Sequence, residues 1–383
     1  MKRFTLLLFC LASVGLCAVA QEPAHVDSAR VVPNSAAVAR IDTIIKENWL
    51  HALKRGKFNV ADSSIHYPRA VKWGVTTFKR VNSVINDYDT TYVAGFKMKW
   101  KVFLKNNYWF DNYDCVPFKN NVFRFECSPS VSIGLYASFR GITLGYSIGV
   151  NNWKGKSRSS RKWEIGFSCA RFSLDYYRIS NSGPMELTII DFANKEKLRY
   201  KNFTGIKRTS WGVSGQYYFN HKHYAPTAVY GFSRRQLISA GSFMAGFNIS
   251  HQKFYLNADN LPPEFHEYAA AEQEVFTSET LYNYTDYCAS VGYGYNWAIG
   301  PKWLWNGTLI VYSGLKHSHP KSISDGGSNF FSANFKARTG IIYSHNHLFG
   351  GVHGSLDTHL FNTSSQRFRR FLFDFTAVVG YRF

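Results

Sequence analysis

The stretch Arg369–Phe383, RRFLFDFTAVVGYRF, has an apolar residue at every second position. The odd-numbered residues from Phe371 to Phe383 are all apolar, and polar residues such as Arg370 and Asp374 lie between them. Because successive side chains of a strand point to opposite faces, the stretch predicts a strand with one apolar and one mostly polar face. At about 13 residues it exceeds the about 9–11 that a tilted strand needs to cross a bilayer, whereas soluble sandwich strands run about five or six. The stretch therefore favours a transmembrane β-strand.

The first 20 residues, MKRFTLLLFCLASVGLCAVA, have the pattern of a secretory signal peptide. A basic head precedes an apolar run over residues 4–17, and Ala18-Val19-Ala20 is an A-x-A cleavage site. The apolar run is too short for a membrane helix. A lipoprotein signal is disfavoured because Leu16, which is not a small residue, precedes Cys17. The sequence predicts an exported chain, cleaved after residue 20, without a transmembrane helix.

The chain is strongly basic and rich in aromatic residues. Its formal charge is +20, or +18 once Lys2 and Arg3 leave with the signal peptide, and 17% of its residues are aromatic. Disordered chains are poor in aromatic residues, so this composition indicates a folded protein. No zinc-finger, helix-turn-helix or RNA-binding motif accompanies the charge, and export argues against nucleic acid as a partner. An anionic membrane surface is the better partner.

Four cysteines follow the signal peptide, which is too few for a disulfide scaffold in a chain of this length. Cys115 and Cys127 fall in one predicted loop, where they either pair as a disulfide or remain two thiols. Cys169 and Cys288 fall on opposite faces of separate predicted strands, so we expect no bond between them.

Residues 21–95 predict a periplasmic N-terminal segment with one helix near 38–57. Ile41, Ile45, Trp49 and Leu53 recur there at helical spacing, with charged residues elsewhere on the surface. Residues 58–95 show no such period, and we expect them to be irregular.

From about residue 96 the sequence alternates between apolar and polar residues. We predict strands at 97–105, 129–140, 141–150, 162–170, 171–180, 207–219, 224–250, 284–298, 302–315, 329–344, 348–361 and 369–383. The strand at 224–250 is too long for a simple strand, so we expect it to contain a bulge or to extend past the membrane.

Short and long connections alternate between these strands. Short turns fall at 140–141, 170–171, 220–223, 299–302 and 345–347, and long loops at about 106–128, 151–161, 181–206, 251–283, 316–328 and 362–368. Short periplasmic turns and long outer loops are typical of outer-membrane barrels. An even number of strands, here twelve, places both ends of the barrel in the periplasm. Because no backbone polar group can stay unpaired in lipid, the strands must form a closed barrel. The sequence therefore predicts an all-β fold, a closed antiparallel transmembrane β-barrel of about 12 strands over residues 96–383.

The outward faces of the predicted strands are apolar, as lipid contact requires. Two of them consist of Val131, Ile133, Leu135, Ala137 and Phe139, and of Ile142, Leu144, Tyr146 and Ile148. Trp303 and Trp305 follow a short turn and suit the aromatic girdle at the periplasmic interface. Tyr381 and Phe383 resemble the carboxy-terminal signal of outer-membrane barrels, so we expect the barrel assembly machinery as a partner.

Four stretches carry a family resemblance: DTTYV at Asp89–Val93, ASFRGITLGYS at Ala137–Ser147, YYFN at Tyr217–Asn220 and RRQLISAGSF at Arg234–Phe243. They resemble a Bacteroidota family of outer-membrane barrels, the domain-of-unknown-function family 4421, over about residues 86–383. The resemblance implies an outer-membrane location and a barrel architecture. It brings no established activity and therefore implies no catalytic residue.

Ionisable residues gather on the inward face of the last predicted strands. We expect a polar network in the lumen from Lys336, Arg338, His353, Asp357, His359, Arg370 and Asp374. Residues two apart on one strand face lie about 6.6 Å apart, so this strand alone provides neither a metal site nor a hydrolase triad. If the last hairpin pairs symmetrically, Asp357 lies opposite Asp374, with Lys336 and Arg338 as the neutralising cations. The network is either structural or lines a narrow path.

The predicted loop NNWKGKSRSSRKW, residues 151–163, is basic and contains no acid. Its cations are Lys154, Lys156, Arg158, Arg161 and Lys162. Lipopolysaccharide phosphates, which accept charge-assisted hydrogen bonds from Arg and Lys, are its natural partner. The alternative is a solvated basic loop.

These observations predict a non-enzymatic outer-membrane protein without a cofactor or metal. We expect either a narrow polar-solute pore, because twelve strands lie between filled and open barrels, or a component of a surface, secretion or envelope complex. The alternative is an outer-membrane lipid hydrolase or deacylase, for which Ser355 with Asp357 and His359 are the nearest candidates.

Overall fold

The computed structural model describes residues 47–49, 65–98, 100–117, 121–139, 142–150, 160–181, 184–191, 194–271, 279–319, 328–362 and 366–383. The chain divides into two units, Met1–Ile85 and Asn86–Phe383. The first holds a short parallel pair, β1 (Glu47–Asn48) with β2 (Ile65–His66), and the helix α3 (Arg69–Ile85). No helix in the described part of the chain is long and apolar enough to cross a membrane.

The N-terminal unit differs from the sequence prediction. Of the predicted helix at 38–57 only residues 47–49 lie among the described residues, and two of these form β1. The helix α3 lies in a segment that was expected to be irregular. Val71, Val75 and Phe78 have helical spacing there, but the β-branched Thr76 and Thr77 weaken the local helix propensity. The second unit begins at 86, before the expected boundary at 96.

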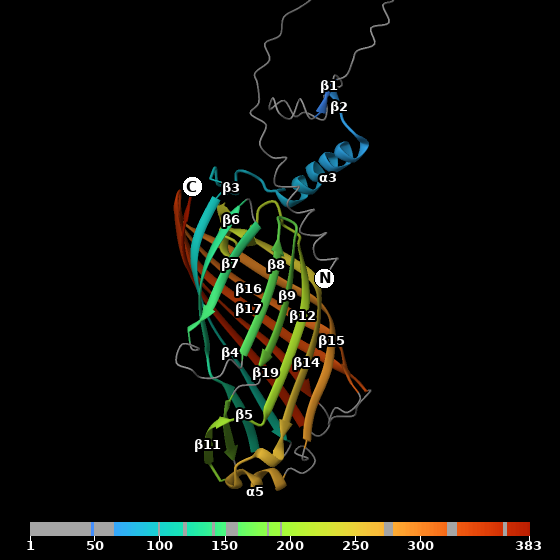
Figure 1. Cartoon of the computed structure of the whole chain (residues 1–383), viewed down its shortest axis with the longest axis vertical. Helices are drawn as coiled ribbons and strands as arrows, with labels where there is room; N and C mark the ends of the chain where they lie inside the picture. The colour runs from blue at the N-terminus through green and yellow to red at the C-terminus, as the bar shows by residue number, and fades with distance from the viewer. Residues whose placement is uncertain are drawn as a thin grey trace, which may run out of the picture. The chain divides into compact units, whose positions relative to one another are not determined.

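Twelve strands of the second unit form a strongly curled antiparallel wall (Figure 1). They are β4 (Trp100–Pro117), β6 (Ser130–Phe139), β7 (Ile142–Gly149), β8 (Ser160–Ser168), β9 (Phe172–Asn181), β12 (Ile206–Tyr218), β14 (Ala240–Asn257), β15 (Glu279–Ile299), β16 (Trp303–Ser318), β17 (Asn329–His345), β18 (Leu348–Asn362) and β19 (Gln366–Arg382). Each predicted strand has a counterpart among them. The predominantly β architecture is confirmed.

The wall runs from β7 through β6, β4, β19, β18, β17, β16, β15, β14, β12 and β9 to β8. Within the described residues no ladder joins β7 to β8, and the residues that connect them, 151–159, lie outside that part. The structure is therefore a curled sheet, and closure of the barrel remains a prediction.

The two faces of the wall follow the predicted alternation. On β19, Arg370 and Arg382 are buried on the inside, whereas Val379 and Tyr381 are exposed on the outside. The predicted lipid-facing residues Ile133, Leu135, Tyr146 and Ile148 are exposed, as are Trp303 and Trp305. The side chains of Ile142 and Leu144 lie outside the described part.

One end of the wall, where the long connections lie, is covered by an apolar cap. The cap consists of β5 (Asn121–Cys127), β10 (Met185–Asp191), β11 (Glu196–Phe203), η2 (Ala258–Asn260) and α5 (Pro263–Ala271), which lie at the lower end in Figure 1. Its core joins Phe125, Leu187 and Phe265 to the ends of wall strands at Phe254 and Tyr282. These elements occupy predicted loops, because β4 extends to Pro117 and pairs there with β5.

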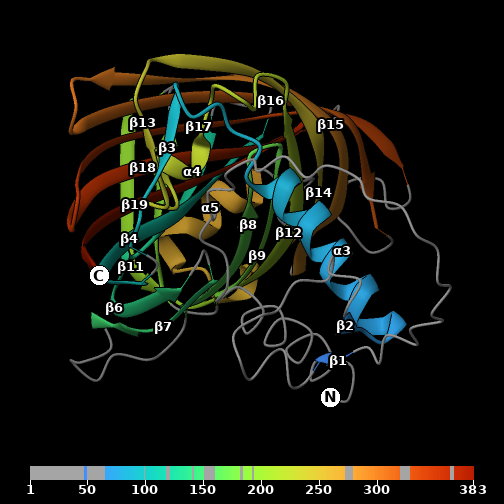
Figure 2. The same ribbon diagram turned by 90° about the horizontal axis from the view of Figure 1, so that it is seen from above.

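The other end, which carries the short turns, is filled by a segment from between β12 and β14. This plug, residues 225–233, contains α4 (Pro226–Val229) and lies inside the curl in the end-on view (Figure 2). Its residues Ala228, Val229 and Phe232 form an apolar core with inward residues of the wall. The plug is followed by β13 (Arg234–Gln236), which pairs with β3 (Val93–Gly95). The predicted strand at 224–250 is thus wrong in its first part, because Pro226 starts a helical turn and β14 begins only at Ala240.

Candidate functional site: the polar interior

Between the cap and the plug, the inside of the wall is lined by charged side chains. They stand at alternate positions of the strands, which point inward when the intervening positions face outward. Several are nearly or fully buried, among them Asp111, Arg208, Asp286, Lys316 and Arg370. A buried charge is tolerated only when it is paired and hydrogen-bonded, so the partners of these residues define the interior.

The strongest cluster links opposite sides of the wall. Arg370 of β19 donates from Nε and Nη2 to the Asp111 carboxylate of β4, at 2.8 and 3.2 Å, and from Nη1 to Gln252 Oε1 of β14 at 2.8 Å. Arg208 of β12 lies 3.5 Å from the same carboxylate and donates to the Asp111 carbonyl oxygen at 3.1 Å. Tyr113 donates to Asp111 at 3.0 Å. Four strands separate β19 from β14 in the sheet, so these bonds cross the lumen.

A second cluster runs along neighbouring strands. Lys336 Nζ lies 3.3 Å from Asp357, its ladder partner on β18, which confirms the expected contact between these two residues. His359 lies between Asp357 and Asp286, 3.6 and 3.8 Å from their carboxylates. Asp286 in turn pairs with Lys316 at 2.5 Å, and both side chains are fully buried. The pairs continue from β18 through β17 to β16 and β15.

Asp374 is paired differently from the prediction. It is the ladder partner of Ser355, two positions away from Asp357 on the same strand. Its cation is Lys162 of β8, and Asn107 Nδ2 donates to it at 3.0 Å. The expected contact of Asp374 with Lys336 or Arg338 is therefore wrong. The register of the last hairpin differs by two residues from the symmetric one, which separates Asp374 from Lys336, and Arg338 pairs with Asp175 instead.

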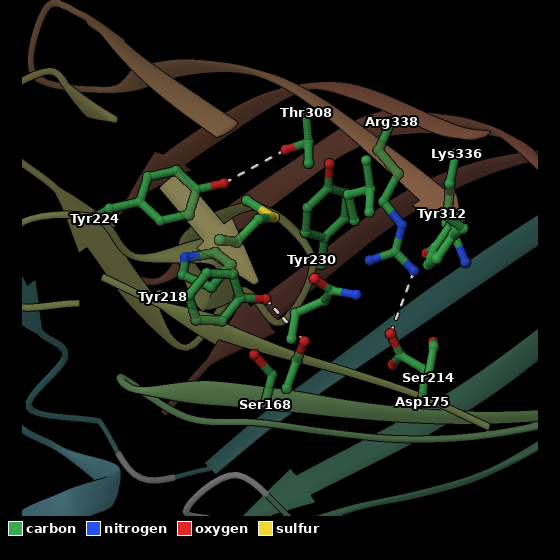
Figure 3. Close-up of a pocket in the computed structure, with 15 residues that line it drawn as sticks. Ser168, Asp175, Ser214, Tyr218, Tyr224, Tyr230, Thr308, Tyr312, Lys336 and Arg338 are labelled. Atoms are coloured by element: carbon green, nitrogen blue, oxygen red, sulfur yellow. Dashed lines mark hydrogen bonds and ion pairs between the residues drawn. The ribbon is translucent and has the colours of Figure 1, made fainter. Parts of the chain in front are cut away.

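Arg338 borders a polar cavity of about 70 Å³ (Figure 3). It reaches Asp175 on β9 at 3.4 Å, across four intervening strands of the sheet. Tyr218, Tyr224 and Tyr230 line the same cavity on the side of the plug. The volume suffices for a few water molecules.

Two cations secure the plug against the wall. Lys101 Nζ donates to the Gly231 carbonyl oxygen at 2.5 Å, and Arg382 Nη2 donates to the Phe232 carbonyl oxygen at 3.1 Å. The Arg382 guanidinium lies between the rings of Phe96 and Phe349, 3.7 and 4.3 Å from their centroids. Because Lys101 and Arg382 are ladder partners on β4 and β19, the plug is fixed to the pair of strands that includes the last one.

An ion pair and hydrogen bonds connect the segment before β3 to the turn end. Asp87 lies 2.6 Å from Arg171 and 3.1 Å from His221, and the hydrogen bonds from Arg171 hold the pKa of Asp87 below its ordinary value of 3.8. Tyr88 bonds Thr227 of the plug at 3.0 Å, and burial raises the pKa of Tyr88 to about 12. The resemblance stretches that begin at Asp89 and Arg234 meet here in the β3–β13 ladder.

The remaining predicted residues are spread over the molecule. His353 points inward and its ring lies edge-on to Tyr230, 5.6 Å between centroids. Lys154, Lys156 and Arg158 lie outside the described residues, and Arg161 is exposed on the outer face of β8. Lys162 points inward to Asp374 and Glu164, so its expected place in a surface loop is wrong.

The two cysteines and the C-terminal aromatics can also be located. Cys115 and Cys127 are buried thiols and do not form the disulfide that was one of the two expectations. Tyr381 and Phe383 are exposed on the outer face at the end of β19. Phe383 N–H donates to the Trp100 carbonyl oxygen at 3.0 Å. A role in barrel assembly stays a prediction.

Several interior residues carry no signal in the sequence that marks them as such. Asp111 and Lys316 fell into predicted loops, because their strands continue beyond the apolar band and lose the contrast between the two faces. Asp175 and Arg208 lie on predicted strands, but their partners come from the opposite side of the lumen. Among the described residues, no group of three or more His, Cys, Asp or Glu is placed to hold a metal ion.

The sequence pattern of one protein family, described as a domain of unknown function, matches residues 87–383. The chain belongs to the DUF4421 family. The match begins at Asp87, one residue after the start of the second unit, so the DUF4421 domain comprises the wall, the cap and the plug. No curated protein matches the chain.

Several solved structures are similar to this DUF4421 chain at low sequence identity. The outer membrane protease OmpT of Escherichia coli is 8% identical with a TM-score of 0.36, covering 76% of this chain and 99% of that one. The translocator domain of the Neisseria meningitidis autotransporter NalP is 10% identical with a TM-score of 0.29, covering 82% and 97%. A Pseudomonas aeruginosa FadL homologue is 10% identical with a TM-score of 0.22, covering 74% and 90%. Likeness of this degree says nothing about what this chain does.

Proposed function

We propose that this DUF4421 protein is a non-enzymatic outer-membrane barrel with a closed lumen, which serves as a component of an envelope complex. The outer face of β15 supports the membrane placement, since its outward residues from Tyr287 to Ile299 are all apolar or aromatic. Twelve residue steps of about 3.4 Å, tilted by about 45°, cover about 29 Å along the membrane normal. This height matches the apolar band of a bilayer.

The observation that carries the closed lumen is the cluster of Asp111, Arg370 and Arg208. Its bonds cross the interior between the apolar cap and the plug, so an open path would require them to separate. Removing one partner of a buried ion pair costs about 3–5 kcal/mol. Spontaneous opening of this cluster is therefore rare, and the protein is better suited to anchoring partners than to conducting solutes.

A narrow polar-solute path is the second candidate. The cavity beside Arg338 is lined by hydroxyl and charged groups, and the inward residues Glu164 and Ser168 of β8 are exposed. Such a path would run along β8 and past the plug.

The hydrolase alternative requires a nucleophile, a base and an acid in contact. Ser355 points to the interior, where its ladder partners are Arg338 and Asp374, and His359 lies beside Asp357 on the same strand. Ser355 and His359 are four residues apart on one strand, which places them about 13 Å apart. This is too far for a hydrogen bond between a nucleophile and its base, so we do not propose catalysis.

Conductance of the full-length protein in a planar bilayer separates these functions. We expect no current steps from the wild type, although heat-modifiable migration shows a folded barrel. Steps from the wild type would refute the closed lumen and favour the polar path. Steps only after replacement of residues 225–233 by a Gly-Ser linker would place the closure at the plug and not at the cluster of Asp111, Arg370 and Arg208. Native electrophoresis of mildly extracted outer membranes should show an assembly larger than the monomer, and a monomer alone would contradict the envelope complex.

A further inference from the structure

The outer face of the wall carries a belt of cations at the loop end of four neighbouring strands. We call Arg161 of β8, Arg178 of β9, Lys207 of β12 and Lys253 of β14 the outer belt. All four side chains are exposed, and none forms an ion pair with a described residue. The outward positions of these four strands include no Asp or Glu, because Asp175 and Glu164 face the interior.

The strand register aligns the belt in rows across the wall. The first row consists of Trp163, Arg178, Trp211, His251 and Thr285. The second row consists of Arg161, Ser180, Thr209, Lys253 and Asn283. Arg178 thus lies between two tryptophans, and Lys207 follows in the next row beside Tyr255. The rows form one continuous surface instead of scattered charges.

The belt lies where the apolar band ends. Thr285 belongs to the first row, and the next outward residue of β15 is Tyr287, the first of the apolar band. On β8, the exposed Ile165 and Phe167 follow Trp163 toward the turn end. Tryptophan and tyrosine are enriched at membrane interfaces, so the belt is level with the headgroups of the outer leaflet.

The opposite side of the wall provides a contrast. There Arg124 pairs with Asp114 at 2.8 Å, and Asp114 is also the ladder partner of Arg369. Arg124 thus meets an acid of the same chain, whereas the cations of the outer belt form no ion pair with a described residue. A row of exposed cations without an acid of the chain beside them attracts anions from outside the chain.

We propose that the outer belt binds the phosphate groups of an anionic glycolipid in the outer leaflet. From β8 to β14 it spans three strand spacings of about 4.8 Å, or about 14 Å, so it offers separate cations to two phosphates on one headgroup. Arg pairs with phosphate through two parallel hydrogen bonds, and the flanking tryptophans contact the sugar and acyl region. The partner is thus a phosphorylated lipid held on the wall. This inference rests on the proposed membrane placement.

Binding of labelled diphosphorylated lipid A to the full-length protein in phosphatidylcholine bicelles tests the proposal. The triple variant Arg178→Gln, Lys207→Gln and Lys253→Gln should bind about tenfold more weakly, since exposed ion pairs contribute a few tenths to 1 kcal/mol each. Removing the phosphates from the lipid should weaken binding to the wild type by a similar factor. Added salt should also weaken it.

A charge-matched control removes three exposed cations from the turn end: Lys97→Gln, Lys222→Gln and Lys302→Gln. This variant should bind like the wild type. The proposal would be overturned if both triple variants weakened binding equally. It would also be overturned if the wild type bound lipid A equally well with and without its phosphates. Heat-modifiable migration of each variant verifies the fold, and a wild type that fails to insert into vesicles would refute the membrane placement itself.

Discussion

Asp111→Asn is the substitution that most directly tests the cluster of Asp111, Arg370 and Arg208 that crosses the lumen. The change keeps the size of the side chain and removes the charge that neutralises both Arg370 and Arg208, all of them at most 3% exposed. Removing one partner of a buried pair costs about 3–5 kcal/mol, because the remaining charge stays in a medium of low dielectric constant. The two bonds from Arg370 are also weakened, but such losses are not additive, so we expect a total in the same range.

Asp114→Asn is the matched control on the same strand. Asp114 pairs with Arg124, whose side chain is 39% exposed, and a pair of this kind contributes about 0–1 kcal/mol. Urea unfolding of the protein inserted in phospholipid vesicles, followed by tryptophan emission, gives the two free energies. The double variant Asp111→Asn, Arg370→Met should recover part of the loss, since it removes one of the two uncompensated cations. The buried cluster around Asp111 would be refuted if Asp111→Asn lowered the free energy of unfolding by less than about 1 kcal/mol. It would also be refuted if Asp111→Asn lowered that free energy by no more than Asp114→Asn does.

Three further changes have defined outcomes. Asp357→Asn should lower the unfolding temperature and Lys336→Met in the same chain should partly restore it, because the two side chains are 3.3 Å apart; no restoration would contradict the pair. Arg382→Met should expose residues 225–233 to limited proteolysis, since it removes the donor to the Phe232 carbonyl, and unchanged digestion would mean that the other contacts hold the plug alone. Because the folded pKa of Asp87 is below 3.8, its stabilising contribution is present above that pH and lost as the pH falls through the lower folded value. Pepsin should therefore cut the segment before β3 more readily at the most acidic pH, and Asp87→Asn should remove this pH dependence.

The wall strands were predictable because their two faces differ strongly in polarity. On β19 every second residue is apolar and faces outward, and the residues between them include Arg370 and Asp374, which face the polar interior. The contact of Lys336 with Asp357 was equally predictable from the sequence. A short turn between neighbouring antiparallel strands allows only a few pairing registers.

The contrast ends where the strands leave the apolar band. On β16, Lys316 points inward and His317 outward, so both faces are polar and the alternation that identifies a strand is lost. The same holds for Asp111 and Asn112 on β4. Pairs that cross the lumen depend on the stagger of strands far apart in the sheet, which no local pattern records. The plug was mistaken for part of a strand, although Pro226 at its start is a helix signal.

The crossed bonds of Asp111 and Arg370 also have a mechanical consequence. A thin tube under lateral pressure flattens easily, because bending its wall requires little force compared with stretching it. Struts between opposite walls prevent such flattening, and here polar contacts fix β19 to β14 and β4 to β12 near the cap end of the wall. In the proposed membrane placement, the cross-section should therefore keep its shape there when the surrounding bilayer becomes thinner or thicker. Adjustment to membrane thickness is then left to the tilt of the whole tube and to the lipids around it.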